Sequence, residues 1–301
     1  MKNRKLKYNS SQKILNNHFV PGGKTLYKMK KRIITLIDFS SYSENLLNFT
    51  ETLADITKAD ILLIHQVAGI VPALSDDNSR KEIIEIELSE ALKRLKELAR
   101  EKISAQKNIK YLVTQKPLIL LLPELGSYDS DDVVLAGLKG TGILKKIFLG
   151  STISKIIDDL NLVTIAVPLK TKDLKPEKLI VGINYRYPIN RSGLDHLLRT
   201  LEGSVLELEF ISVITPDDKE NDTIKYIRQL SEDYRVKVPN TNYKIFSGKN
   251  AFEEIKNYMP RDNKTFLVLQ KGSRSLKDQV FRKFVVNDLI YHGAVPLIIL
   301  P

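Results

Sequence analysis

The sequence predicts an α/β protein made of two tandem, doubly wound domains, each with a five-stranded parallel sheet. Three observations predict this fold. Short runs of β-branched residues alternate with amphipathic helical stretches, as expected of parallel strands joined by helical crossovers. The pattern of runs restarts after a polar segment near the middle of the chain. A glycine-rich segment stands between a strand and a helix in the first half, which is where α/β proteins hold phosphate groups.

Five strands and three helices are predicted in the first half from the spacing of its apolar residues. The strands are expected at residues 33–37, 61–65, 111–113, 133–136 and 163–167. The helices are expected from Tyr42 to about Thr57, from Ser79 to Ala105 and from Ile153 to Leu160. The second helix is highly charged around one apolar stripe, so we expect its charged side to be solvated.

The second half repeats the strand pattern, which indicates an internal duplication. Strands are expected again at residues 179–183, 206–213, 265–269 and 297–300. Aligning Pro168 with Pro301 gives an offset of 133 residues, whereas the first strands of the two halves align at an offset of 146. The predicted division is a basic extension at 1–29, a domain at 30–168, a polar linker at 169–177 and a second domain at 178–301.

The net charge of +11 is concentrated at the beginning of the chain. Residues 1–30 carry eight Lys or Arg and no acidic residue, which leaves a net charge of +3 for the remainder. We therefore do not expect nucleic acid as a partner of the globular part. The extension is predicted to be flexible. The sequence leaves open whether it is a functional arm or a dispensable addition.

The composition narrows the chemistry that the chain can perform. It has no Cys, which excludes disulfides, thiolate metal sites and a cysteine nucleophile. No apolar run is long enough to span a bilayer, and we expect a cytoplasmic protein without a membrane partner. The four histidines, His18, His65, His196 and His292, are scattered, so neither a metal site nor a catalytic group is predicted. His65, at a strand end, is interpreted as a packed or capping residue.

The most informative motif is the spacing of three glycines after the fourth predicted strand. Gly137, Gly140 and Gly150 follow the pattern G-x2-G-x9-G, with Ser151 and Thr152 next. Glycines let a backbone approach phosphate oxygens closely, and the free N–H groups at a helix start receive the charge. A turn that only needs positive φ is the alternative. Asp38, after the first strand, is a second candidate, although it can simply cap the following helix.

Together these features resemble the universal stress protein family. The resemblance rests on the opening Arg-Ile-Ile-Thr-Leu-Ile-Asp-Phe-Ser at residues 32–40, on the second strand that ends in His65, and on the spacing G-x2-G-x9-G-[S/T]. It extends to both halves, so the chain looks like a tandem member. The resemblance implies a Rossmann-like fold of the adenine nucleotide alpha hydrolase type, with strand order 3-2-1-4-5. The first and fourth strands then lie side by side, and their carboxyl ends frame one crevice.

The resemblance also implies roles for named residues. Asp38 would lie by the adenine and ribose, and Gln66 falls where the family places an adenine contact. The glycine-rich loop would close over ribose and phosphates at Gly137 and Gly140, and phosphate donors would come from Gly150, Ser151 and Thr152. Lys139 would neutralise phosphate charge, although a solvated loop lysine is the simpler interpretation. The implied ligand is ATP, or ADP or AMP, with or without Mg²⁺.

The second half departs from the motif. Gln270, Ser273, Lys283 and Phe284 stand opposite Gly137, Gly140, Gly150 and Ser151, and Asn184 stands opposite Asp38. Side chains thus occupy places where the backbone must approach a phosphate. We therefore expect one nucleotide per chain, with the second half pairing with the first. A homodimer of whole chains is left open.

The sequence thus predicts a regulatory stress-response module that binds an adenine nucleotide in its first half and is not an enzyme. Two alternatives stay open. One is a weak ATPase or another nucleotide-dependent enzyme, although no general base or water-positioning group is evident. The other is an interaction scaffold that binds no nucleotide.

Overall fold

The computed structural model describes residues 31–68, 76–125, 132–137, 162–168, 173–216, 218–248, 251–260, 262–270 and 295–301. The first half contains β1 (Arg32–Leu36), α1 (Tyr42–Thr57), β2 (Asp60–Gln66), α2 (Asp77–Lys102), β3 (Ile109–Thr114), α3 (Leu118–Leu125), β4 (Asp132–Gly137) and β5 (Val163–Val167). The second half contains β6 (Lys178–Gly182), α6 (Arg191–Thr200), β7 (Glu207–Ile214), α7 (Glu220–Arg235), β8 (Thr241–Ser247), α8 (Ala251–Tyr258), β9 (Thr265–Gln270) and β10 (Leu297–Leu300).

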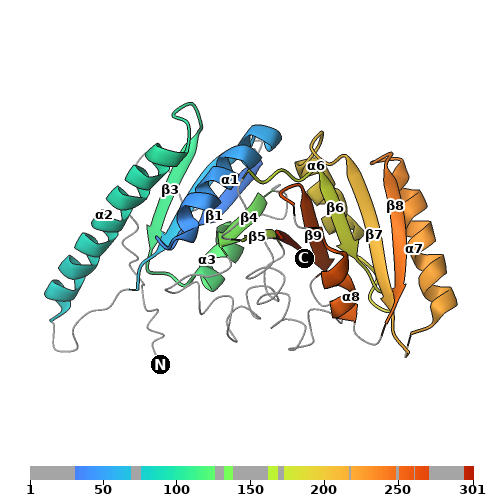
Figure 1. Ribbon diagram of the computed structural model, residues 1–301. Helices are drawn as coiled ribbons and strands as arrows, with labels where there is room; N and C mark the ends of the chain where they lie inside the picture. Colours follow the sequence, from blue (N-terminus) through green and yellow to red (C-terminus); the bar gives the residue numbers. More distant parts are fainter. Residues whose placement is uncertain are drawn as a thin grey trace, which may run out of the picture.

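All ten strands belong to one sheet (Figure 1). The first half contributes the order β3-β2-β1-β4-β5, with every neighbouring pair parallel, so the predicted α/β class and the order 3-2-1-4-5 are confirmed. The second half continues the sheet as β10-β9-β6-β7-β8, which is the same order reversed. The halves meet where β5 and β10 pair antiparallel, with Ile298 opposite Ile165.

Helices cover both faces of the sheet and bury two apolar cores. One core lies under α1, α2, α6 and α7 and includes Leu53, Leu95 and Leu230. The other lies under α3 and α8 and includes Leu121 and Ile255. Because successive strand residues point to opposite faces, β1 contributes to both cores. A strand that is buried on both sides needs an almost continuous apolar run, which is what the sequence has here.

The two long helices of the first half lie close to their predicted bounds. The predicted helix from Tyr42 to Thr57 is confirmed as α1. α2 begins two residues before the predicted Ser79, because the Asp76 side chain accepts hydrogen bonds from the backbone N–H groups of Asn78 and Ser79. It ends at Lys102, before the predicted Ala105, since Ile103 has an extended backbone. The predicted helix 153–160 lies outside the described residues.

Five described elements were not assigned from the sequence, namely α3, α6, α7, β8 and α8, and two of them lack a clear pattern. α3 is a short helix that is apolar on nearly every side and contains Pro123, so it lacks a helical period. β8 lies at the edge of the sheet and only Thr241 in it is buried, so it has no continuous apolar run. In the described part of the chain, no helix combines the length and the apolar character that crossing a membrane requires.

An ion pair joins the amino ends of β1 and β4. Arg32 lies opposite Asp132 in the parallel register, and its Nε donates to Oδ1 of Asp132 at 2.9 Å while a second nitrogen pairs with Oδ2. The same guanidinium donates to the backbone carbonyl of Leu125, at the end of α3, at 2.7 Å. The Asp132 side chain is fully buried, so its negative charge is stabilised by the two guanidinium nitrogens of Arg32.

Replacing Arg32 with Met should therefore lower the free energy of unfolding by about 2 kcal/mol or more, because a buried carboxylate loses its bidentate cation. Urea denaturation measures the change. Lys264→Met is the matched control, since Lys264 is exposed and its pair with Glu177 should contribute much less to stability than the buried pair. Equal effects of the two substitutions would contradict this assignment.

Candidate functional site

Three predicted site residues meet at the carboxyl edge of the sheet, where the winding reverses. β1 lies between β2 and β4, with Leu36 opposite both Ile64 and Ala136. Asp38 follows the end of β1, whereas Gln66 and Gly137 are the last residues of β2 and β4. Doubly wound sheets bind their ligands at this position.

Only one oxygen of the Asp38 carboxylate has hydrogen-bond partners among the described residues. Its Oδ1 accepts hydrogen bonds from the backbone N–H of Ser40 at 3.0 Å and from the Ser43 hydroxyl at 3.4 Å. These bonds close a turn before α1, whose N-cap residue is Ser41 and not Asp38. Its Oδ2 is buried and has no hydrogen-bond partner among the described residues. A buried carboxylate oxygen without a donor is costly, so this atom is suited to a donor from a ligand.

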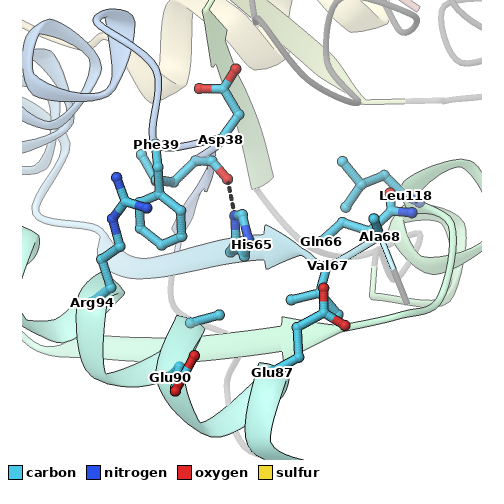
Figure 2. A pocket seen from close by; sticks show the side chains of 12 residues that line it. Asp38, Phe39, His65, Gln66, Val67, Ala68, Glu87, Glu90, Arg94 and Leu118 are labelled. Carbon is cyan, nitrogen blue, oxygen red and sulfur yellow. Dashed lines mark hydrogen bonds between the residues drawn. The ribbon is translucent and has the colours of Figure 1, made fainter. Parts of the chain in front are cut away.

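Phe39 adopts a left-handed backbone conformation, with φ of 57°. Such a conformation is unfavourable for a bulky side chain and occurs often at functional sites. It places the Phe39 ring 4.3 Å from the His65 ring, and the Arg94 guanidinium lies over Phe39 at 4.3 Å. The three side chains form a stack that links the end of β1 to β2 and α2 (Figure 2). Sequence reasoning missed Phe39 and Arg94, because a stack between distant segments leaves no local pattern.

His65 is fixed by a hydrogen bond to the main chain. Its Nδ1 lies 2.8 Å from the carbonyl oxygen of Ile37. A carbonyl oxygen can only accept, so Nδ1 carries the proton and Nε2 keeps a lone pair. Burial is the largest influence on the pKa of His65 and lowers it below 6.5, while the Ile37 carbonyl and Asp38 act in the opposite direction. The packed role predicted for His65 is confirmed.

Gln66 points to the other face of the sheet. Its Oε1 accepts a hydrogen bond from the backbone N–H of Leu118, at the start of α3, at 3.2 Å. This bond satisfies one of the free donors at a helix start. The amide NH₂ of Gln66 is the part of the side chain that remains as a donor.

Packing favours glycine at position 137. A Cβ atom at this position would lie 3.0 Å from the Cβ of Tyr42, which is tighter than nine in ten real Cβ contacts. The other predicted loop residues, Lys139, Gly140, Gly150, Ser151 and Thr152, lie outside the described residues.

A cavity of about 420 Å³ opens at this edge of the sheet, as bounded by the described residues. It extends from α2 across the end of β2 to the start of α3. Phe39 and Arg94 lie on one side of Figure 2, and Gln66 and Leu118 lie on the other. Among its described residues, the lining carries three carboxylates, those of Asp38, Glu87 and Glu90, and one cation, Arg94. The cavity thus favours hydrogen-bond donors over anionic groups.

In the second half, Gln270 makes hydrogen bonds at the position that corresponds to Gly137. Gln270 ends β9 as Gly137 ends β4, and its Oε1 accepts a hydrogen bond from the backbone N–H of Asn190. Its Nε2 donates to the carbonyl of Pro188 at 3.2 Å. These two hydrogen bonds of Gln270 therefore join the segment that precedes α6 to the end of β9. Asn184, opposite Asp38, closes its own turn by accepting from the backbone N–H of Arg186 at 2.9 Å.

No group of three or more His, Asp or Glu side chains that could hold a metal ion occurs within the described ranges. The arrangement at the carboxyl edge is thus one of hydrogen-bond acceptors around a cavity, beside a strand end that leads into the glycine-rich segment.

Residues 29–167 match the universal stress protein family, so this part of the chain belongs to that family. The fold is similar to a universal stress protein from Archaeoglobus fulgidus, with a TM-score of 0.62 at 15% identity over 89% of this chain and 97% of the other. It is also similar to a functionally unknown protein from Pseudomonas aeruginosa PAO1, with a TM-score of 0.54 at 11% identity over 90% and 92% of the two chains.

A third similar structure is the cytoplasmic domain of a prokaryotic cation chloride cotransporter. Its TM-score is 0.51 at 14% identity, over 90% of this chain and 95% of that domain. No curated protein matches the sequence. At these identities the structural likenesses establish the fold alone, because one fold carries many functions.

The buried His65 gives a prediction about pH. The unfolded chain binds a proton on His65 more readily than the folded protein, so the free energy of unfolding should decline as the pH falls below about 6.5. Urea denaturation at about pH 7.5 and about pH 5 measures the decline. His65→Ser removes the titrating ring, so its decline should be smaller than that of the wild type. Equal declines would contradict the prediction.

The contact at Gly137 gives a second prediction. Gly137→Ala should lower the free energy of unfolding by about 1–3 kcal/mol in the absence of any ligand, because the added methyl group meets Tyr42. Urea denaturation measures this loss. A variant as stable as the wild type would show that packing does not require glycine here.

Proposed function

We propose that the chain binds an adenine nucleotide in its first half and acts as a regulatory stress-response module. The observation that carries the proposal is the buried Oδ2 of Asp38, which lies at the reversal point of the sheet without a donor among the described residues. A ribose hydroxyl would supply that donor. Membership of residues 29–167 in the universal stress protein family supports the same ligand class.

We assign the proposed contacts with the nucleotide to residues that follow or end β1, β2 and β4 and to the segment after β4. Asp38 accepts from the ribose, and Gln66, at the end of β2, is the predicted adenine contact. Gly137 and Gly140 let the loop approach the ribose and phosphates. The phosphates receive donors from Gly150, Ser151 and Thr152, and Lys139 adds positive charge. ATP, ADP and AMP all fit this scheme, with or without Mg²⁺, and the chain's own role is to bind rather than to hydrolyse them.

The second half has a different proposed role. Gln270 holds the segment before α6 in the place that a ligand would need, so we expect no nucleotide there. Instead, the second domain, 178–301, pairs with the first, 30–168, through the antiparallel contact of β10 with β5. This contact covers an edge of the first domain that would otherwise expose unpaired backbone groups. A cytoplasmic location and a further homodimer are parts of the proposal that remain predictions.

A thermal-shift titration tests the proposal. ATP should raise the unfolding temperature of the full chain by mass action. Asp38→Ala should weaken the apparent affinity about 10- to 100-fold, because it removes a charge-assisted hydrogen bond. Gly140→Val or Gly150→Val should abolish the shift, because a side chain would stand between backbone and phosphate.

The duplication supplies matched controls for this titration. Asn184→Ala, Ser273→Val and Lys283→Val change the corresponding positions of the second half and should leave the shift unchanged. If ATP gave no shift, nucleotide binding would be refuted. If the variants of both halves lost the shift equally, the confinement of binding to the first half would be refuted.

A further inference from the structure

In both halves a side chain of the second strand donates a hydrogen bond to the backbone carbonyl after the first strand. His65 is the donor in the first half and Ser212 in the second. Leu36 pairs with Ile64 in the first half as Gly182 pairs with Ile211 in the second, so His65 and Ser212 occupy equivalent positions. His65 Nδ1 donates to the carbonyl of Ile37 at 2.8 Å, and the Ser212 hydroxyl donates to the equivalent carbonyl of Ile183 at 3.1 Å. The fold therefore requires only one donor here, and serine provides it.

His65 has a second nitrogen that the fold does not use. Because Nδ1 holds the proton, Nε2 is an acceptor, and no hydrogen bond to Nε2 occurs within the part of the chain that the structure describes. The ring is held in place by the Phe39 stack at 4.3 Å, which in turn is held by Arg94. A fixed ring offers its acceptor in one direction with little loss of entropy on binding.

The surroundings of this acceptor select the kind of ligand group that it meets. His65 lines the cavity together with the carboxylates of Asp38, Glu87 and Glu90. Among the described residues, these carboxylates disfavour a phosphate next to His65, so the uncharged end of a nucleotide suits this part of the cavity. Glu90 is exposed and Glu87 is only half-buried, so water satisfies both. The imidazole of His65 is rigid and half-buried, so it distinguishes between ligand groups better than Glu87 or Glu90 does.

We infer that Nε2 of His65 accepts a hydrogen bond from the exocyclic amino group of adenine and so makes the site selective for amino-bearing purines. The inference rests on the proposed nucleotide binding and adds the residue that selects the base. It also accounts for the serine at position 212. In the second half, where Gln270 bonds to the segment before α6, Ser212 supplies the donor to the Ile183 carbonyl and has no counterpart of Nε2.

Isothermal titration of the full chain with two nucleotides tests the inference. AMP carries the amino group, and purine riboside 5′-monophosphate has only hydrogen at the same carbon. The wild type should bind AMP about five- to tenfold more tightly, as expected for one hydrogen bond. In His65→Ser, which copies the solution at Ser212, the two affinities should become equal within about twofold. His65→Gln, whose amide reaches the Nε2 position, should restore part of the preference.

A merely structural role would give a different pattern. In that case His65→Gln would lower the affinities for both nucleotides by the same factor. His65→Ser would bind both with affinities close to those of the wild type. Ser212→Ala is the matched control and should leave the preference of the wild type unchanged.

Failure of the inference is distinguishable from failure of the proposed function. Equal affinity of the wild type for both nucleotides, or an unchanged preference in His65→Ser, would overturn the inference while nucleotide binding stands. Binding of neither nucleotide by the wild type would overturn the proposed function and the inference with it. The wild-type comparison decides between these outcomes even if a variant does not fold.

Discussion

The parallel pairing of β1 with β4 is the contact on which the rest of the structure depends. It closes a loop of 100 residues and places Arg32 opposite Asp132 and Leu36 opposite Ala136. At the amino ends the pairing is fixed by a buried ion pair, and at the carboxyl ends it brings Asp38 beside the segment that begins at Gly137. Because β2 continues the sheet on the other side of β1, His65 and Gln66 reach the same edge. The cavity is thus a consequence of strand order.

The duplication separates what the fold needs from what a ligand needs. Both halves keep the pairing of their first and fourth strands and the hydrogen bond from the second strand to the residue after the first. They differ at three positions near this edge. Asp38 corresponds to Asn184, His65 to Ser212, and Gly137 to Gln270. In each pair the second-half side chain makes a hydrogen bond to the backbone, whereas Oδ2 of Asp38 has no partner among the described residues and Gly137 packs against Tyr42.

The sequence predicts the scaffold better than it predicts the site. Strands such as β1 and β10 are buried on both faces, and their continuous apolar runs identify them. α3 was not predicted, because Pro123 and apolar residues on nearly every side leave no helical period in its sequence. At the site, Asp38 and Gly137 were found through their place after strands. The stack of Arg94 on Phe39 and His65 was not found, because it depends on the strained backbone of Phe39 and on how α2 packs.

The central claim is that one of two duplicated crevices holds a nucleotide and the other is closed by its own side chains. Equilibrium dialysis of the full chain against saturating ATP counts bound nucleotide directly. The account predicts a limit of one nucleotide per chain. A limit of two would show that Gln270 does not close the second crevice, and a limit of zero would show that the acceptors around Asp38 serve only the fold.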